Sequence, residues 1–292
     1  MEGHNLHSKL ISVPTSRIVF NCYQIDRGSK LYGQWLYDRK RGWAFEQPLP
    51  RILYKYCRPE RVHVLRECLV RFSQRTVFED ERELRPEVAE FGTEEEMRAY
   101  MQFNPYFRAM PTWLIDAIVH RMLTGAGWQA GIARIAQSNV KASDEFGIFC
   151  LCEQPNSNEM WEAYAATSGF VVAFDTTHTA FESLWNPGKL GKVTYSDEPL
   201  GTFLGSYGPE AFFRKRAKYA FECEWRIIRA LHRLERAGDH NGHPVLVARL
   251  DPACVQEVLI RPECSVEHEL RELVATDDRY RHVAIRRVEN TG

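Results

Sequence analysis

Two glutamates separated by one residue are the strongest chemical signal in the chain. Glu222 and Glu224 open a run of β-branched and aromatic residues, and this pattern predicts a β-strand. Because side chains two residues apart on a strand share a face, we expect both carboxylates and Arg226 to lie together. Two carboxylates beside one guanidinium can hold different protonation states, which suits a site that stabilises developing positive charge. The alternative is a solvated strand face with a cross-strand ion pair, and the sequence leaves both interpretations open.

A lysine and a pair of aromatic residues are the next candidates for a site. Lys55 lies between Tyr54 and Tyr56 in a short predicted strand. A half-buried ammonium there needs an anionic partner, either a carboxylate of the fold or a ligand phosphate. Trp161 and Tyr164 are three residues apart in a predicted short helix, and so lie on one helical face. Such a pair usually packs in a core, and the other interpretation is a stacking platform for a flat ring.

The bulk composition excludes some classes of protein. With 38 basic and 39 acidic residues among 292, the net charge is −1, so no global field attracts nucleic acid or an anionic membrane. A hydrophobic content of 44% is enough for a packed core. No apolar run approaches the roughly 20 residues of a membrane span, and the N-terminus lacks the pattern of a signal peptide. We therefore expect a cytoplasmic protein with no membrane partner.

The eight cysteines are scattered among apolar neighbours. In the absence of a secretion signal, we expect them to be reduced core thiols. Cys150 and Cys152 form a C-x-C pair, whereas a zinc knuckle needs C-x-x-C and a second pair at suitable spacing. We therefore expect no metal site.

The elements that must position these residues lie mostly in the C-terminal half. Asn156-Ser157-Asn158 is expected to cap the short helix that carries Trp161 and Tyr164. Lys215 and Lys218 are expected on the exposed side of a helix at 209–219. Further helices are predicted at 60–68 and 266–274, and strands at 51–56, 147–153, 169–175, 192–195, 222–228, 245–250, 255–260 and 282–288. Short strands with local helices fit an α+β domain with a mixed, mainly antiparallel sheet and flanking helices.

The chain is predicted to form one main domain, residues 51–292, with an N-terminal extension of residues 1–50 packed on it. The extension interleaves aromatic and basic residues but contains no recognisable nucleic-acid-binding motif. The acidic tract at 79–96 is expected to be an exposed loop or helix. A helical insertion is predicted at about 94–140, and the glycine-rich stretch at 125–131 has the wrong spacing for a dinucleotide-binding loop.

Four segments, which together cover about residues 52–262, carry a resemblance to a known family. They are Leu53-Tyr54-Lys55-Tyr56, Phe149-Cys150-Leu151-Cys152-Glu153, Met160-Trp161-x-x-Tyr164 with the strand at 169–174, and Lys215, Tyr219, Glu222, Glu224 and Arg226 in that order. These segments resemble a bacterial family known as domain of unknown function 2971. Cys152 stands where the family usually has Ser, which implies the loss of a hydroxyl contact. Residues 77–81 stand where the family has an Asn-Asp-Pro-Phe turn, which implies a reshaped loop.

The order of parts in that family is also similar to that of ADP-ribosyltransferases. The resemblance implies that the protein cleaves NAD and transfers ADP-ribose to an unknown acceptor, which is a protein, a nucleic acid or water. Glu224 would stabilise an oxocarbenium-like state, and Glu222 would orient or deprotonate the acceptor. Lys55 would hold the pyrophosphate, and Trp161 or Tyr164 would stack on a ring. The remaining contacts to NAD that the resemblance implies come from Tyr54, Cys152 and Arg226.

Two other functions stay open at this point. In the first, the chain is a non-catalytic module that binds a ligand or a partner, and Glu222, Glu224 and Arg226 form a structural ion-pair network. In the second, it is a nucleic-acid-processing enzyme of bacterial conflict or phage defence. Arg39-Lys40-Arg41 would then contact phosphates, and binding would depend steeply on salt.

Overall fold

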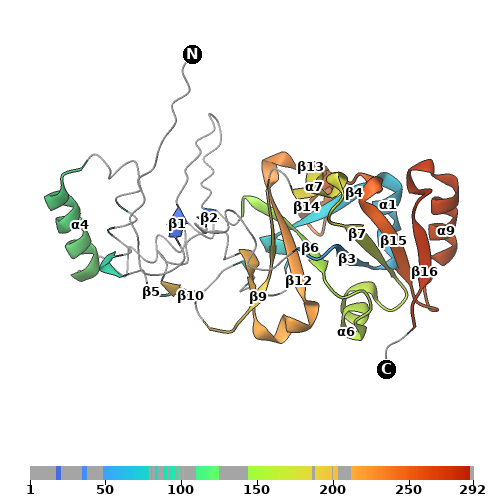
Figure 1. Ribbon diagram of the computed structural model, residues 1–292, viewed down its shortest axis with the longest axis horizontal. Coiled ribbons are helices and arrows are strands. Elements are labelled where there is room, and N and C mark those ends of the chain that lie inside the picture. Colours follow the sequence, from blue (N-terminus) through green and yellow to red (C-terminus); the bar gives the residue numbers. More distant parts are fainter. Residues whose placement is uncertain are drawn as a thin grey trace, which may run out of the picture.

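The computed structural model confirms a mixed α and β fold with a mainly antiparallel sheet (Figure 1). Ten strands of the described part form one sheet, in which the β15–β16 pair is parallel and the other pairs are antiparallel. The residues described are 49–78, 80, 83–84, 88–90, 93–95, 98, 101, 110–124, 144–185, 188–198, 200–202 and 212–289, together with 18–20 and 35–37.

The sheet runs in the order β13-β14-β4-β6-β3-β7-β15-β16, and β12 lies on the other edge of β6, followed by β8. Its central strand β7 is buried over five of its six residues, as expected for a strand covered on both faces. The bounds are β3 (Ile52–Cys57), β4 (Leu69–Gln74), β6 (Phe146–Cys152), β7 (Phe170–Asp175), β8 (Lys189–Lys192), β12 (Glu224–Ala230), β13 (Glu235–His240), β14 (His243–Arg249), β15 (Val255–Ile260) and β16 (Ala284–Arg287).

Strand β6 is where the sheet divides. One edge of β6 pairs with β12 along its whole length. On the other edge, β4 pairs at Gly147 and Ile148, whereas β3 pairs at Cys152. The carbonyl of Cys150 lies between these two pairings, and Lys55 Nζ donates a hydrogen bond to it at 2.8 Å. Because an unsatisfied backbone carbonyl is costly, this lysine stabilises the fork in the sheet.

The two faces of β6 and β12 differ in character. Directly opposed residues of an antiparallel pair point to the same face, so Leu151 and Trp225 share one face, and Cys152 and Glu224 share the other. The face of Leu151 and Trp225 belongs to the main hydrophobic core. The opposite face adjoins a smaller apolar cluster that contains Cys152 and Trp161.

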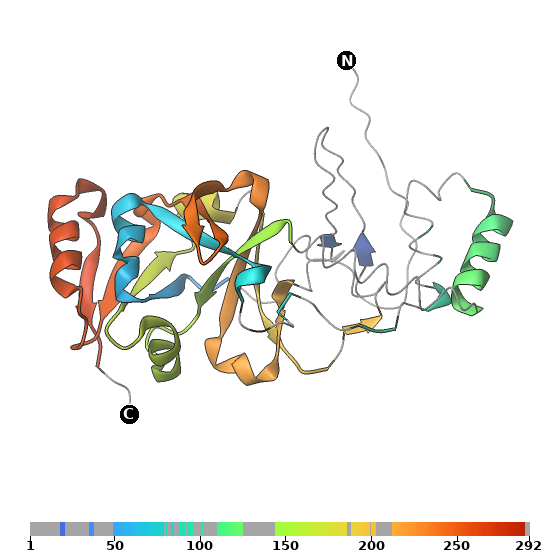
Figure 2. The ribbon, with the colours of Figure 1, turned by 180° about the vertical axis from the view of Figure 1, so that it is seen from behind.

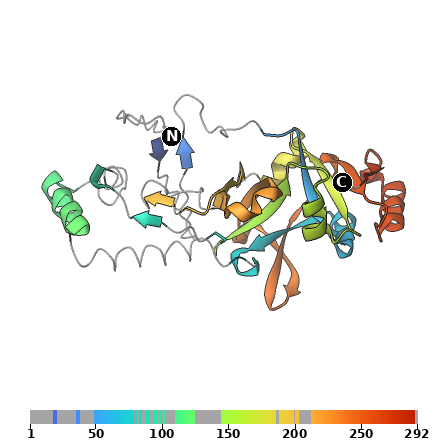
Figure 3. The same cartoon turned by 90° about the horizontal axis from the view of Figure 1, so that it is seen from below.

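Four helices flank the described sheet, α1 (His63–Glu67), α6 (Asn158–Met160), α7 (Thr179–Trp185) and α9 (Glu267–Thr276), whereas α4 (Thr112–Thr124) lies away from it (Figure 1). The predicted cap of α6 is confirmed, because Ser157 Oγ accepts a hydrogen bond from Met160 N at 3.3 Å. A π-helical turn, Trp161–Ala165, follows α6 directly. Seen from behind, α4 lies at the end of the molecule opposite to α9 (Figure 2), and the β13–β14 hairpin extends away from the sheet (Figure 3).

Three short strand pairs lie outside the ten-stranded sheet. Strands β1 (Ile18–Phe20) and β2 (Trp35–Tyr37) are antiparallel. Parallel pairs form between β5 (Val88–Glu90) and β10 (Leu200–Thr202), and between β9 (Thr194–Tyr195) and β11 (Arg214–Lys215). The rest of the predicted N-terminal extension, including Arg39-Lys40-Arg41, lies outside the described residues, as does the glycine-rich stretch at 125–131.

Most predicted strands are confirmed, but several other predictions are wrong. In place of a helix at 209–219, the described residues form β11 and a 3₁₀ helix, Ala217–Glu222. Glu83 and Leu84 are buried, so the acidic tract is not simply exposed. The predicted strand at 192–195 is interrupted at Val193, between β8 and β9. The sequence pattern also missed β13 and α7.

Two further predictions concern the cysteines and membrane segments. The seven cysteines within the described ranges are free thiols, and five of them are buried. Over those same ranges, none of the helices has the length and apolar character that spanning a membrane requires.

We expect Gly169→Ala to destabilise the fold strongly. An added Cβ would lie 2.1 Å from the carbonyl oxygen of Cys57 and 2.5 Å from that of Ala165. Both obstacles are backbone, so the substitution should cost about 3 kcal/mol, at the upper end for overpacking. Urea unfolding checks this, with the neighbouring Ser168→Ala as a control that should change stability by less than about 0.5 kcal/mol. Equal stability of the two variants would contradict the predicted clash.

Candidate functional site

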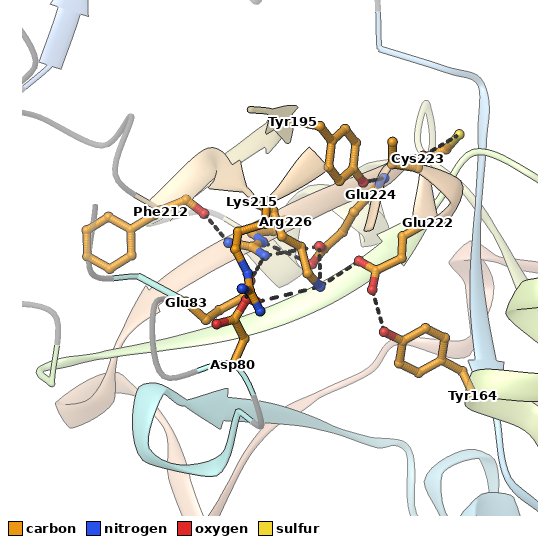
Figure 4. A network of polar contacts seen from close by, with 12 residues as sticks. Asp80, Glu83, Tyr164, Tyr195, Phe212, Lys215, Glu222, Cys223, Glu224 and Arg226 are labelled. Carbon is orange, nitrogen blue, oxygen red and sulfur yellow. Dashed lines mark hydrogen bonds and ion pairs between the residues drawn. The ribbon is translucent and has the colours of Figure 1, made fainter. Parts of the chain in front are cut away.

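The predicted acidic pair lies in a buried cluster of charged side chains (Figure 4). Three carboxylates, those of Glu83, Glu222 and Glu224, surround the ammonium of Lys215 and the guanidinium of Arg226. Glu222 and Glu224 are each 3% exposed, and Arg226 is fully buried. The interpretation as a solvated strand face is therefore wrong, because the cluster is almost entirely shielded from water.

A backbone turn, and not the alternation of a strand, brings the two glutamates together. Glu224 is the first residue of β12, whereas Glu222 ends the 3₁₀ helix Ala217–Glu222. Cys223 between them has a φ of 42°, in the left-handed region that is uncommon for residues other than glycine. The expectation that both glutamates lie on one strand is therefore corrected, although their carboxylates still converge on Lys215.

Arg226 fixes the position of Glu224. Its Nε donates to Glu224 Oε1 at 2.9 Å and its Nη2 donates to Glu224 Oε2 at 3.0 Å. Nη2 also bonds Glu83, and Nη1 donates to the carbonyl oxygen of Phe212 at 2.7 Å. A bidentate pair of this kind fixes the orientation of the carboxylate, and it is needed here because a buried charge without partners is costly.

Lys215 is the residue that all three carboxylates share. Its Nζ lies 2.6 Å from Glu222, 3.4 Å from Glu224 and 3.7 Å from Glu83. The side chain is 8% exposed, so the prediction that Lys215 lies on an exposed helix face is wrong. Its ammonium also lies 4.6 Å from the centre of the Tyr219 ring, a cation–π contact.

Two tyrosines complete the cluster. Tyr164 donates a hydrogen bond from its hydroxyl to Glu222 Oε1 at 2.5 Å, and the residue is 39% exposed to solvent. Tyr195 Oη accepts a hydrogen bond from the backbone N–H of Glu224 at 2.7 Å. Tyr164 therefore marks the side on which the cluster comes closest to solvent.

The environments of the two glutamates shift their pKa values in opposite directions. Burial alone would raise the pKa of Glu224, but Arg226 and Lys215 outweigh burial and hold the pKa of Glu224 below its ordinary value. Burial raises the pKa of Glu222 from 4.5 to about 6, against the opposing effect of Lys215. Near neutral pH, Glu224 is therefore ionised, and Glu222 exchanges a proton in the physiological range.

Lys55 does not join this cluster. On β3 it shares a face with Leu53 and Cys57, which belong to the main core, and its Nζ lies 5.1 Å from the centre of the Phe149 ring. Tyr54 lies on the opposite face, paired with Cys152 beside Glu224. The structure therefore brings Tyr54 and Cys152 to the side of the carboxylates and leaves Lys55 on the other side.

Trp161 is a core residue. Its side chain is fully buried, the guanidinium of Arg261 lies 4.7 Å from its ring centre, and the Tyr56 ring packs against it edge-on at 5.7 Å. A ligand ring has no access to it, so the interpretation of Trp161 as a stacking platform is wrong. Of the aromatic pair, Tyr164 alone contacts the charged cluster.

Sequence reasoning missed Glu83 and Tyr195. Glu83 is hidden in the acidic tract, where nothing in the local pattern separates it from its solvated neighbours. Tyr195 ends the short strand β9, which carries no residue pattern that points to a site. Among the residues that the structure describes, no group of three or more His, Cys, Asp or Glu side chains is arranged to hold a metal ion.

Comparisons with protein-family models, with curated proteins and with solved structures gave no match. The resemblance to domain of unknown function 2971 and to ADP-ribosyltransferases therefore stays a prediction that rests on the motif residues.

We expect Lys215→Met to destabilise the protein by about 3–5 kcal/mol at neutral pH, because it leaves buried carboxylates uncompensated. Without the ammonium, the folded-state pKa values of Glu222 and Glu224 should rise. The loss should therefore shrink as the pH falls and the carboxylates take up protons. Urea unfolding at several pH values measures this, with the exposed Lys218→Met as the matched control. A loss in Lys215→Met no larger than in Lys218→Met would show that the shared ammonium is dispensable.

We expect Glu222 to make the protein less stable as the pH rises through about 6. Its folded-state pKa lies above the ordinary value of 4.5, so its contribution is fully present below about pH 4.5 and is lost as the pH passes 6. This difference between the folded-state pKa of Glu222 and its ordinary value corresponds to about 2 kcal/mol of stability. Urea unfolding of wild type and Glu222→Gln at pH 5 and pH 7.5 isolates this group, because the variant lacks it. Parallel pH dependence of the two proteins would contradict the raised pKa.

Proposed function

We propose that this protein is an enzyme similar to ADP-ribosyltransferases, which cleaves NAD between nicotinamide and ribose and passes ADP-ribose to an acceptor. The observation that supports the proposal is the pair of glutamates that meet on Lys215 with pKa values shifted in opposite directions. Carboxylates whose environments separate their pKa values are typical of sites that divide electrostatic and proton-transfer work between two residues.

The chemistry of the reaction matches that division. When the bond between ribose C1′ and the nicotinamide nitrogen breaks, the bonding electrons go to nicotinamide, which leaves as a neutral molecule. No acid is needed for this leaving group. The ribosyl fragment becomes an oxocarbenium-like cation, which a nearby fixed negative charge stabilises. Glu224 is ionised and rigidly held by Arg226, and so suits this part.

Glu222 suits the second part of the reaction. The acceptor, water or a macromolecular nucleophile, forms the new bond to C1′ and must lose a proton. A base works best when its pKa lies near the working pH, and burial raises the pKa of Glu222 to about 6. Tyr164, which is hydrogen bonded to Glu222 and partly exposed, lies where the substrate would enter. Tyr54, which is half-buried on the same side of the sheet, is the candidate for a further NAD contact, whereas Cys152 is 1% exposed and packs in the smaller apolar cluster.

One observation favours a second candidate, a binding module in which the cluster is purely structural. Arg226 and Lys215 already bond both carboxylate oxygens of Glu224. If the cluster is purely structural, Glu224→Gln should lower the melting temperature, and neither the wild type nor the variant should cleave NAD. A catalytic carboxylate, in contrast, often contributes nothing to stability or even lowers it, so its replacement need not lower the melting temperature.

We expect the purified protein to release nicotinamide from NAD, and Glu224→Gln to slow this release by about 10²-fold to 10³-fold. Glu222→Gln should slow steady-state release, because each turnover requires the acceptor to lose a proton, and should remove a rise in rate as the pH passes about 6. Chromatographic measurement of nicotinamide checks both results. Glu162→Gln, an exposed carboxylate on the turn that carries Tyr164, is the matched control and should retain the wild-type rate.

The proposal fails if wild-type protein neither releases nicotinamide nor binds NAD in calorimetry. If Glu224→Gln releases nicotinamide at the wild-type rate, the proposed reaction stands but Glu224 is not its catalytic carboxylate. A large fall in melting temperature with no NAD binding would favour the structural module.

A further inference from the structure

Two thiols lie beside the carboxylate pair, and neither takes part in a chemical step of the proposed reaction. Cys223 is the residue between Glu222 and Glu224, and Cys152 is the residue of β6 directly opposite Glu224. The backbone N–H of Glu153 donates to the carbonyl oxygen of Cys223 at 3.1 Å, so the two chain segments are adjacent at this point. Cys223 is therefore one residue away from the position directly opposite Cys152, and a disulfide can bridge residues whose Cα atoms are about 4.4–6.8 Å apart.

The two sulfur atoms share a neighbouring residue. A single residue, Gln154, contacts both: its backbone N–H donates to Cys152 Sγ at 3.2 Å and its side-chain Nε2 donates to Cys223 Sγ at 3.3 Å. Both cysteines pack in the same small apolar cluster. The left-handed φ of Cys223 explains this placement, since it removes the residue from the alternation of β12.

The two thiols differ in exposure in the way that a pair of attacking and resolving thiols requires. Cys223 is half-buried, whereas Cys152 is 1% exposed. A reagent from solution therefore meets Cys223 first. The buried cysteines of the main core, Cys57, Cys68, Cys254 and Cys264, lack this combination of a partly exposed thiol and a near neighbour.

We propose that Cys223 is an oxidative modification site for hydroperoxides, with Cys152 as its resolving thiol. The Cys223 thiolate attacks the peroxide, the O–O bond breaks, and a sulfenic acid forms while water or an alcohol leaves. The Cys152 thiol then attacks the sulfenic sulfur, a second molecule leaves as water, and the disulfide forms. The two thiols together lose two electrons and two protons, and one peroxide is reduced.

The disulfide would act on the carboxylate pair through the backbone. It would tie the turn that separates Glu222 from Glu224 to the end of β6, and would replace the contacts of both sulfurs with Gln154. Where the proposed function holds, we expect oxidation to lower the rate of nicotinamide release, and a dithiol reductant to restore it. Burial raises the pKa of both thiols, so we expect slow oxidation at neutral pH that accelerates as the pH rises.

Mass spectrometry of the full chain tests the proposal. Wild-type protein is treated with hydrogen peroxide, free thiols are blocked, and the protein is digested without reductant. The expected product is a peptide pair linked through Cys152 and Cys223 that has lost two hydrogen atoms and separates after reduction. Cys223→Ser should abolish the linked pair, whereas Cys264→Ser, a core thiol, should retain it. Cys152→Ser should leave Cys223 as a sulfenic acid that a dimedone probe captures.

The proposal is overturned if both thiols stay reduced, or if Cys223 oxidises while Cys152 remains free in wild-type protein. The linked peptide is measured without NAD, so its absence leaves the proposed function untouched, and failure of NAD cleavage leaves the disulfide result intact. If both hold, peroxide should inhibit wild-type nicotinamide release and should not inhibit Cys223→Ser.

Discussion

The balance of buried charge among three glutamates, one lysine and one arginine is the constraint on which the site depends. Taking charges out of water costs several kcal/mol for each ion, so each must find partners of opposite charge within the cluster. Here the partners come from distant parts of the chain: Glu83 from the acidic tract, Lys215 from β11 and Arg226 from β12. The cluster therefore fixes three separate segments against each other, in addition to positioning the carboxylates.

The sheet supplies the frame that makes this arrangement possible. Because β6 pairs with β12 over its full length, Glu224 and Arg226 stand beside Cys152 and Cys150 on one face, while Trp225 anchors the other face in the core. Where the sheet divides at β6, Lys55 donates a hydrogen bond to the backbone carbonyl of Cys150, which lies between the two strand pairings. The early lysine thus has a structural role on the face opposite to the carboxylates.

Local patterns predicted the strands of the sheet well, because alternation and β-branched residues are properties of short stretches of sequence. The cap at Ser157 was predictable for the same reason. Short 3₁₀ segments carry no such period, so the pattern could not place Glu222 at the end of one or Lys215 in the interior. Nor could it distinguish Glu83 from its acidic neighbours, since the burial of a carboxylate depends on a partner 143 residues away. For Trp161 and Tyr164, the shared helical face was visible, but their different burial was not.

The charge balance also explains why the two glutamates differ. Three carboxylates share two permanent cations, so one negative charge of the cluster is left without a full partner. Glu224 receives the guanidinium of Arg226 and part of the ammonium of Lys215, whereas Glu222 receives Lys215 and a neutral hydroxyl. Burial, together with the missing cation, therefore raises the pKa of Glu222, the glutamate that bonds the partly exposed Tyr164. One carboxylate with a fixed negative charge and one that titrates are then consequences of burying three carboxylates with two cations.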